Sequence, residues 1–122
     1  MLKKDEKFII FSLNQQTCAV PIFDSHQVFA IQNLSPVPMV NANIAGLTYY
    51  DGHIVTVLNT AKILSIKDKV GHKQAVLLRY ENHYYAYLVD QILEIVERSF
   101  LQKNKIKILS LDEILKTLNF HE

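Results

Sequence analysis

An acidic residue at a tight turn is the first candidate for chemistry in this sequence. In the stretch GLTYYDGHIVTVLN, Asp51 follows two tyrosines and precedes Gly52 and His53. An Asp-Gly pair between two apolar strands predicts a two-residue type I′ turn, in which both residues adopt positive φ. The turn alone accounts for the carboxylate. Catalysis by Asp51 would need a second acid or base held nearby, and the sequence nominates none.

The histidines, the cysteine and the glycines give no recognisable cofactor or metal motif. No two of the five histidines stand four residues apart on a predicted helix, so we expect surface histidines, with a metal site assembled from distant loops as the alternative. Cys18 lies in the apolar run TCAVPI and is expected to be buried. The three glycines are too far apart for a phosphate-binding loop. We therefore expect no catalysis, no cofactor, no metal and no small-molecule substrate.

Length and composition indicate one soluble globular domain covering residues 1–122. The chain is 49% hydrophobic and 20% charged, and its formal net charge is +1. That balance provides no global positive field to attract nucleic acid or acidic lipid. The apolar runs are too short to span a bilayer, and MLKKDEKFII is not a secretory signal. We expect a cytoplasmic protein without membrane insertion.

Short strands joined by tight turns predict a mainly β fold. Runs of β-branched and aromatic residues predict strands at 7–13, 17–22, 28–32, 46–50, 53–59, 74–80, 84–90 and 91–100, and alternation predicts a last strand at 103–109. Helical segments are expected at 24–27, 60–64 and 110–118, and a linker at 65–73. Many short strands in a small chain favour a closed or nearly closed barrel.

Three single residues carry local predictions. Pro21 cannot donate to a ladder, so it should lie at a strand end or on an edge. Ser110 should cap the last helix, with Glu113 three residues later. Asp90 follows an apolar run, and we expect it to hold a neighbouring loop through backbone hydrogen bonds rather than to act as an acid.

Three lysines provide the alternative of nucleic-acid binding. Lys103, Lys105 and Lys107 alternate in QKNKIKIL, so on one strand they would share a face. A basic stripe near tyrosines suits single-stranded nucleic acid. Lysines that protect an edge strand from aggregation give the same pattern, and we prefer that interpretation.

The order of these segments resembles a CheW-like domain over residues 7–118. The family has a glycine, an Ile-Asn-x-Arg-Gly turn and then Ile-x-Pro-Val-x-Asp, and this chain matches it without gaps through Gly46, Gly52, Ile54 and Val57. TCAVPI is similar to the Tyr-Ala-Ile-Pro-Ile strand of the family, and LVDQILEI to its Val-Asp-x-Val-x-x-Val segment. The resemblance implies two intertwined, SH3-like small β-barrels with short helices and a C-terminal helix.

The chain departs from the family pattern at several positions and in length. The family's Asn, Arg, Pro and Asp of the hairpin, and the glycine before Val-Asp, are replaced here by Tyr49, Asp51, Thr56, Asn59 and Ala86. The segment after Val96 is short, so the second barrel should be trimmed. Strand edges exposed by this trimming would favour a homodimer.

The resemblance implies an adaptor without catalysis in a bacterial chemosensory system, and we expect a system that controls pili or gliding rather than flagella. Its implied partners are the regulatory domain of a histidine kinase and the cytoplasmic tip of a chemoreceptor. Carried over by position, the partner-binding candidates are Val28, Ile31, Gly46, Asp51, Ile54 and Val57, although some of the apolar ones could belong to the core. Aspartate in place of arginine at position 51 reverses the charge at this contact, which would abolish or redirect binding.

Overall fold

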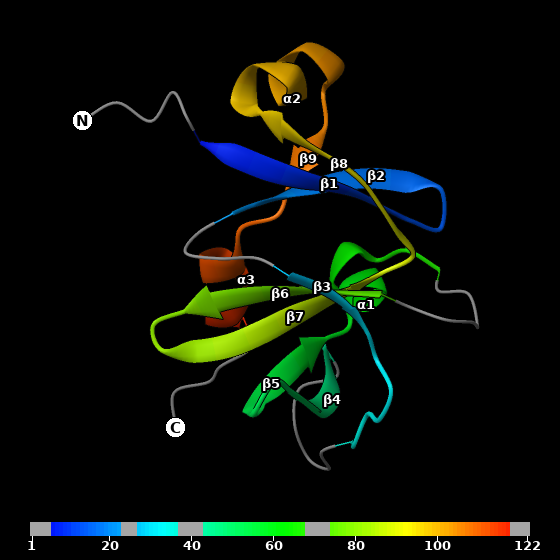
Figure 1. The fold of residues 1–122 in the computed structure, drawn as a ribbon. Helices are drawn as coiled ribbons and strands as arrows, with labels where there is room; N and C mark the ends of the chain where they lie inside the picture. The colour runs from blue at the N-terminus through cyan, green and yellow to red at the C-terminus, as the bar shows by residue number, and fades with distance from the viewer. Residues whose placement is uncertain (1–5, 23–26, 37–42, 68–73, 118–122) are drawn as a thin grey trace.

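Two β-sheets and three short helices make up the part of the chain described in the computed structural model, residues 6–22, 27–36, 43–67 and 74–117 (Figure 1). The strands are β1 (Lys7–Leu13), β2 (Gln16–Pro21), β3 (Gln27–Ala30), β4 (Ile44–Tyr50), β5 (His53–Leu58), β6 (Gln74–Tyr80), β7 (His83–Val89), β8 (Gln91–Glu97) and β9 (Lys107–Ile108). The helices are α1 (Thr60–Leu64), α2 (Arg98–Asn104) and α3 (Leu111–Thr117). The mainly β fold class is confirmed.

The four-stranded sheet has the order β8-β1-β2-β9. Its centre is the antiparallel hairpin of β1 and β2, and β8 returns from the far end of the chain to pair with β1. β9 is short and pairs with β2 in parallel. Pro21 is the last residue of β2, as predicted from its missing N–H group.

The five-stranded sheet has the order β3-β6-β7-β5-β4 and curls into a small barrel. β5 pairs with β7 in parallel, an arrangement that local sequence does not show. The segment after β3 closes the barrel on β4, because Ser35 and Leu47 exchange two backbone hydrogen bonds of 2.8 Å. The Thr48 hydroxyl also donates to the Asn33 carbonyl at 2.6 Å. The four-stranded sheet is the trimmed counterpart of this barrel.

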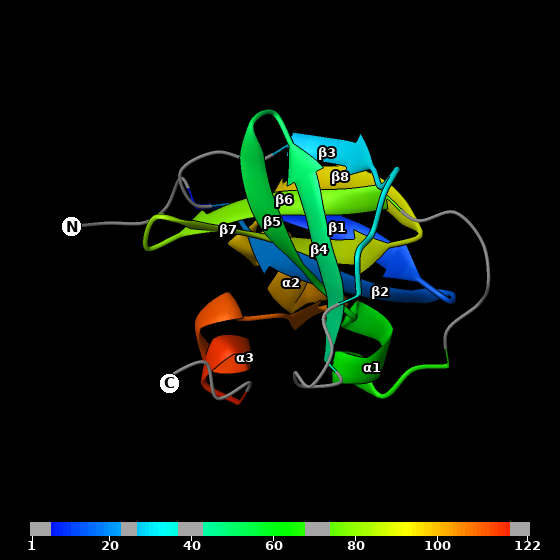
Figure 2. The same ribbon diagram turned by 90° about the horizontal axis from the view of Figure 1, so that it is seen from below.

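One continuous core joins the two sheets. Figure 2 shows that α1 and α3 lie on the same side of the strands. The core contains apolar side chains from the β1–β2 and β6–β7 hairpins, from the end of β5, and from α1 and α3. Phe11 and Tyr87 meet within it, with 6.5 Å between their ring centroids. A second cluster on the other face of the four-stranded sheet packs Phe8 and Ile10 against Leu101 of α2. Cys18 is buried as predicted, and burial raises the pKa of its thiol.

Local signals account for the ends of two helices. The Asn59 side chain accepts a hydrogen bond from the Lys62 N–H at 3.1 Å and so caps α1. The Ser110 hydroxyl accepts one from the Glu113 N–H at 3.4 Å, which confirms the predicted cap of α3. All three helices have five to seven residues, so none in the described segments is long enough to cross a membrane.

The strands predicted at 91–100 and 103–109 are wrong in the part where the two approach each other. Residues 98–104 form helix α2, Lys105 ends it in the left-handed conformation, and only Lys107 and Ile108 are strand. The physical reason is tertiary. A helix brings Leu101 onto the apolar face formed by Phe8 and Ile10, and this burial outweighs the alternating pattern.

The remaining predictions on the path of the chain have mixed outcomes. β3 begins at Gln27 and ends at Ala30, two residues before the predicted end, while residues 24–26 of the predicted helical turn and 68–73 of the predicted linker lie outside the described residues. The Asp90 carboxylate accepts a hydrogen bond of 2.7 Å from the Asn14 N–H, so it holds the β1–β2 turn as expected.

Candidate partner-binding surface

The turn between β4 and β5 has the predicted conformation. Asp51 has φ 51° and Gly52 has φ 81°, as a type I′ turn requires. The Asp51 side chain is exposed at the end of the barrel. The ion pairs found in the described part of the chain (Lys7–Glu97, Arg98–Glu6 and Lys116–Asp112) do not include it. We call residues 49–54 the hairpin tip.

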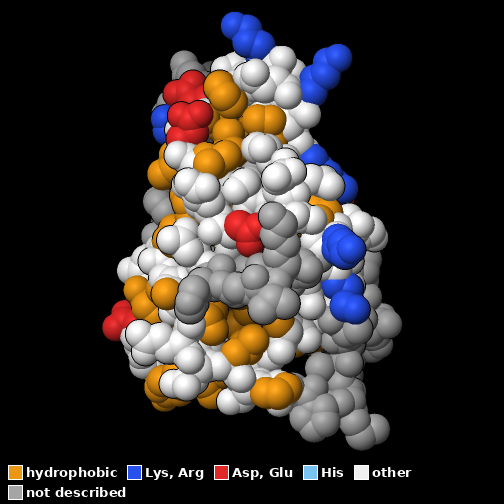
Figure 3. Space-filling view, turned by 90° about the vertical axis from the view of Figure 1, so that its right-hand side faces the viewer, with side chains coloured by type: hydrophobic (Ala, Val, Ile, Leu, Met, Phe, Trp, Pro, Cys, Tyr) orange, Lys and Arg blue, Asp and Glu red, His pale blue; other side chains and the backbone are white. Residues whose placement is uncertain are grey.

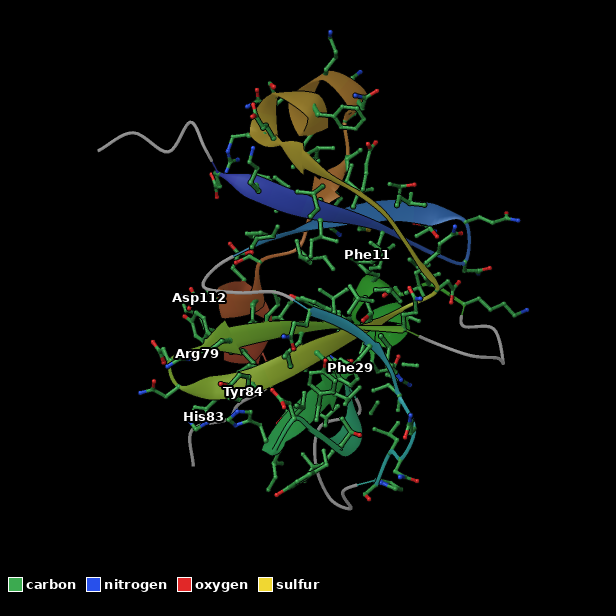
Figure 4. All side chains as sticks on the ribbon, viewed as in Figure 1. Phe11, Phe29, Arg79, His83, Tyr84 and Asp112 are labelled. Carbon is green, nitrogen blue, oxygen red and sulfur yellow. The ribbon has the colours of Figure 1, made fainter. Side chains whose placement is uncertain are left out.

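Aromatic rings are paired on the barrel side of the hairpin tip. Phe29 of β3 stacks on Tyr50 at 4.1 Å between centroids, with 18° between the ring planes. The ring of His53 lies 4.3 Å from the ring of Tyr84 of β7, measured between their centroids. Figure 4 shows Phe29 beside the hairpin and Tyr84 on the neighbouring strand. Four strands, β3, β4, β5 and β7, therefore supply rings around one exposed carboxylate.

Two hollows lie beside Asp51, and both include Tyr50 in their walls. One has a volume of about 300 Å³ and extends over Phe29 and Asn33. The other has a volume of about 140 Å³ and lies between Tyr50 and Tyr84, with His53 at its rim. No Lys or Arg side chain lines either hollow among the described residues.

The outer side of the hairpin tip is apolar and exposed. Tyr49 and Ile54 face each other across the hairpin, with 71% and 62% of their surfaces exposed. With Leu47 they border a shallow hollow of about 270 Å³. Figure 3 shows hydrophobic side chains reaching the surface at this end of the molecule and again near β8 and α2. An exposed pair of large apolar residues on a rigid hairpin is a feature of protein-binding surfaces.

The six sequence-predicted site residues divide by burial. Val28, Asp51 and Ile54 are exposed, and Ile31 is half-buried against the barrel interior. Gly46 and Val57 are buried, which is the alternative that the sequence left open for apolar members of the group.

The lysine stripe does not exist as a strand face. Lys103 lies on α2, Lys105 is the left-handed residue that ends it, and Lys107 lies on β9. Three different backbone conformations cannot align side chains as alternation on one strand would. The tyrosines lie in the five-stranded sheet, whereas these lysines belong to elements that pack on the other sheet.

A separate hollow of about 500 Å³ lies where the β6–β7 turn meets α3. There the Tyr80 hydroxyl donates a hydrogen bond to the Asp112 carboxylate. This bond raises the pKa of Tyr80 to about 12 and lowers the pKa of Asp112. Lys116 adds an ion pair to Asp112 at 3.5 Å. These contacts fasten α3 to the hairpin, and no group of three or more metal-ligating side chains occurs in the described segments.

Sequence reasoning missed Phe29 and Tyr84 as members of this surface. Each is separated from its ring partner by more than twenty residues, and only the barrel closure and the parallel β5–β7 pairing bring them together. The run YYDGH did indicate that aromatic side chains surround the turn. It gave no signal for the strands that complete the ring pairs.

Comparisons with known proteins agree on one family. A family model described as CheW-like domain matches residues 7–116. "Chemotaxis protein CheW" of Thermotoga maritima is 27% identical over 94 residues, which cover 76% of this chain and 62% of that protein. The crystal structure of the scaffolding protein TtCheW from Thermoanaerobacter tengcongensis matches with a TM-score of 0.67 and 21% identity, covering 75% of this chain and 64% of that one. The matched region thus spans less than two thirds of either relative.

Proposed function

Because this chain belongs to the CheW-like domain family, we propose that it is a non-catalytic, single-domain adaptor of a bacterial chemosensory system. In this role it couples chemoreceptors to a histidine kinase in the cytoplasm through protein–protein contacts. The observation that carries the proposal is the hairpin tip, where Tyr49 and Ile54 are exposed beside an acidic turn that has no ion-pair partner among the described residues. The relative from Thermotoga maritima, described as a chemotaxis protein, supports the same class of function.

The proposed contact residues are Val28, Asp51 and Ile54, which are accessible to a partner. Ile31, Gly46 and Val57 support this surface from the barrel side. The acidic charge of this surface suits a different partner from those of family members that have arginine at the turn. We infer that this partner belongs to a system controlling pili or gliding.

We also propose a homodimer formed through β8. In the described chain, β8 pairs on one side only, with β1, and its Leu93 and Ile95 are 46% and 50% exposed. An exposed edge with apolar side chains is a template for pairing with a second copy. Ile95→Lys should therefore convert a dimer to a monomer in sedimentation velocity. A wild-type protein that sediments as a monomer at all concentrations would contradict the dimer.

The adaptor proposal is tested by binding to purified fragments from the same organism. The regulatory domain of each histidine kinase and the cytoplasmic tip of each chemoreceptor are titrated calorimetrically with the wild-type protein. Ile54→Lys should abolish binding, while Phe100→Lys, a change of an exposed apolar residue on α2, should leave it intact. Absence of binding to every kinase and receptor fragment would overturn the proposal.

A further inference from the structure

The two hollows beside Asp51 have the residue types that bind a cation. Their walls combine aromatic rings of Phe29, Tyr50 and Tyr84 with the Asp51 carboxylate, and no lysine or arginine of the described chain lines them. Aromatic faces attract a cationic group through their quadrupole, and a carboxylate adds a charge-assisted hydrogen bond. The same site would repel an acidic ligand.

The β6–β7 turn shows how this chain itself fills a similar hollow. That hollow is also lined by tyrosines and carboxylates, including Tyr80, Tyr85 and Asp112. There, Lys116 of the same chain provides the cation and lies 3.5 Å from the Asp112 carboxylate. The hairpin tip has the acid and the rings but, within the described residues, no such cation of its own.

The size of the smaller hollow favours a single side chain over a metabolite. Pockets for small molecules typically measure about 300–1,000 Å³. The hollow between Tyr50 and Tyr84 has about 140 Å³, and the one over Phe29 about 300 Å³. A planar guanidinium stacks on a ring and pairs with a carboxylate through two parallel hydrogen bonds, which the compact ammonium of lysine cannot do.

We propose that the hairpin tip binds an arginine side chain presented by a protein partner. The guanidinium enters the hollow between Tyr50 and Tyr84 and pairs with Asp51, while an apolar neighbour of that arginine packs on Ile54. This inference rests on the proposed function, since the arginine belongs to the partner of the adaptor, and it adds the chemistry that selects this partner.

The test is an NMR titration with capped tripeptides Gly-X-Gly to about 10 mM, a range that detects millimolar affinity. X is arginine, its uncharged analogue citrulline, or glutamate. The arginine peptide should shift the ring resonances of Tyr50, His53 and Tyr84, and citrulline and glutamate should not. Equal shifts from citrulline, or no shifts from arginine, would overturn the inference.

Two variants separate the carboxylate from the turn that holds it. Asp51→Asn keeps the turn, because Asn-Gly is equally suited to the type I′ conformation. This variant should lower the affinity for the arginine peptide about fivefold, which is the factor that corresponds to an exposed ion pair of about 1 kcal/mol. Glu81→Gln is the matched control, since Glu81 also occupies a left-handed turn position, with φ 51°, and should leave affinity unchanged. Equal affinity of Asp51→Asn and wild type would overturn the role of Asp51.

The calorimetric and NMR results distinguish failure of the inference from failure of the adaptor proposal. Binding of a kinase or receptor fragment that is unaffected by Asp51→Asn would overturn the arginine site and leave the adaptor intact. Binding of the arginine peptide without binding of any fragment would support the site and overturn the adaptor.

Discussion

The α-carbon of Gly46 lies so close to the Ser35 carbonyl that an added Cβ would stand 2.5 Å from its oxygen. This contact occurs at the seam of the barrel, where the segment after β3 bonds to β4. Gly46 also has φ +154°, which disfavours any side chain. Both reasons explain why a glycine stands here, and neither requires contact with a partner.

Gly46→Ala should lower the free energy of unfolding by about 3 kcal/mol, from strain and overpacking together. Urea denaturation measures this loss. Gly52→Ala is the matched control, because its φ is +81° but an added Cβ meets nothing within 4 Å. It should cost only about 1 kcal/mol. Equal losses would contradict the explanation from the close approach to Ser35.

Tyr87→Phe should raise the free energy of unfolding by about 1 kcal/mol. The Tyr87 side chain is 1% exposed, and its hydroxyl has no hydrogen-bond partner in the described part of the structure. A buried unpaired hydroxyl is destabilising, and phenylalanine removes it while keeping the ring against Phe11. Urea denaturation of the two proteins checks the sign. A less stable variant would mean that the hydroxyl is satisfied.

The bond between Tyr80 and Asp112 predicts a pH window for the attachment of α3. The pKa of Tyr80 is raised from 10.0 to about 12, so its contribution to stability is complete below pH 10 and is lost as pH rises through 12. The pKa of Asp112 is lowered from 3.8, so its contribution is complete above that value and is lost as pH falls through its folded pKa.

Tyr80→Phe should remove one tyrosine from the late part of an alkaline titration followed by tyrosinate absorbance. It should also flatten the fall in stability between pH 10 and 12. Tyr84→Phe serves as the comparison, because Tyr84 packs on His53 and on a barrel cluster that contains no residue of α3. Loss of an early-titrating tyrosine on Tyr80→Phe would contradict the bond to Asp112.

Ile54→Lys and Val57→Ala should separate binding from stability on one strand. Ile54 is exposed, so the first change should alter the free energy of unfolding by less than about 0.5 kcal/mol. Val57 is fully buried, so the second should cost about 2 kcal/mol. Thermal and urea unfolding measure both. A large loss of stability in Ile54→Lys would show that lost partner binding reflects damage to the barrel.

Local sequence signals predicted those features whose cause is local. The Asp51-Gly52 turn, the position of Pro21 and the Ser110 cap depend on backbone chemistry within a few residues. Asp90 was also interpreted correctly, because a polar residue after an apolar run has few uses besides bonding to a neighbouring backbone.

Features that depend on tertiary contacts could not be predicted from local sequence patterns. Helix α2 exists because Leu101 packs on the apolar face formed by Phe8 and Ile10 of β1. This strand is distant in sequence, since Lys7 of β1 pairs with Glu97, ninety residues later. The pairing of Phe29 with Tyr50 needs the barrel to close first. Alternation in KNKIKIL was therefore a poor guide, since burial elsewhere decided the conformation.

The pairing of β1 with both β2 and β8 has a consequence for the order of assembly. Strand β2 follows β1 immediately in sequence. In contrast, Lys7 of β1 can pair with Glu97 of β8 only after all residues of the five-stranded barrel have been synthesised. Contacts so distant in sequence form slowly unless the intervening chain is already compact. We expect the barrel to fold first and to bring β8 to β1. During synthesis, the face of the β1–β2 hairpin that carries Phe8 and Ile10 therefore stays uncovered until α2 emerges in the last quarter of the chain, a period in which a chaperone would be of most use.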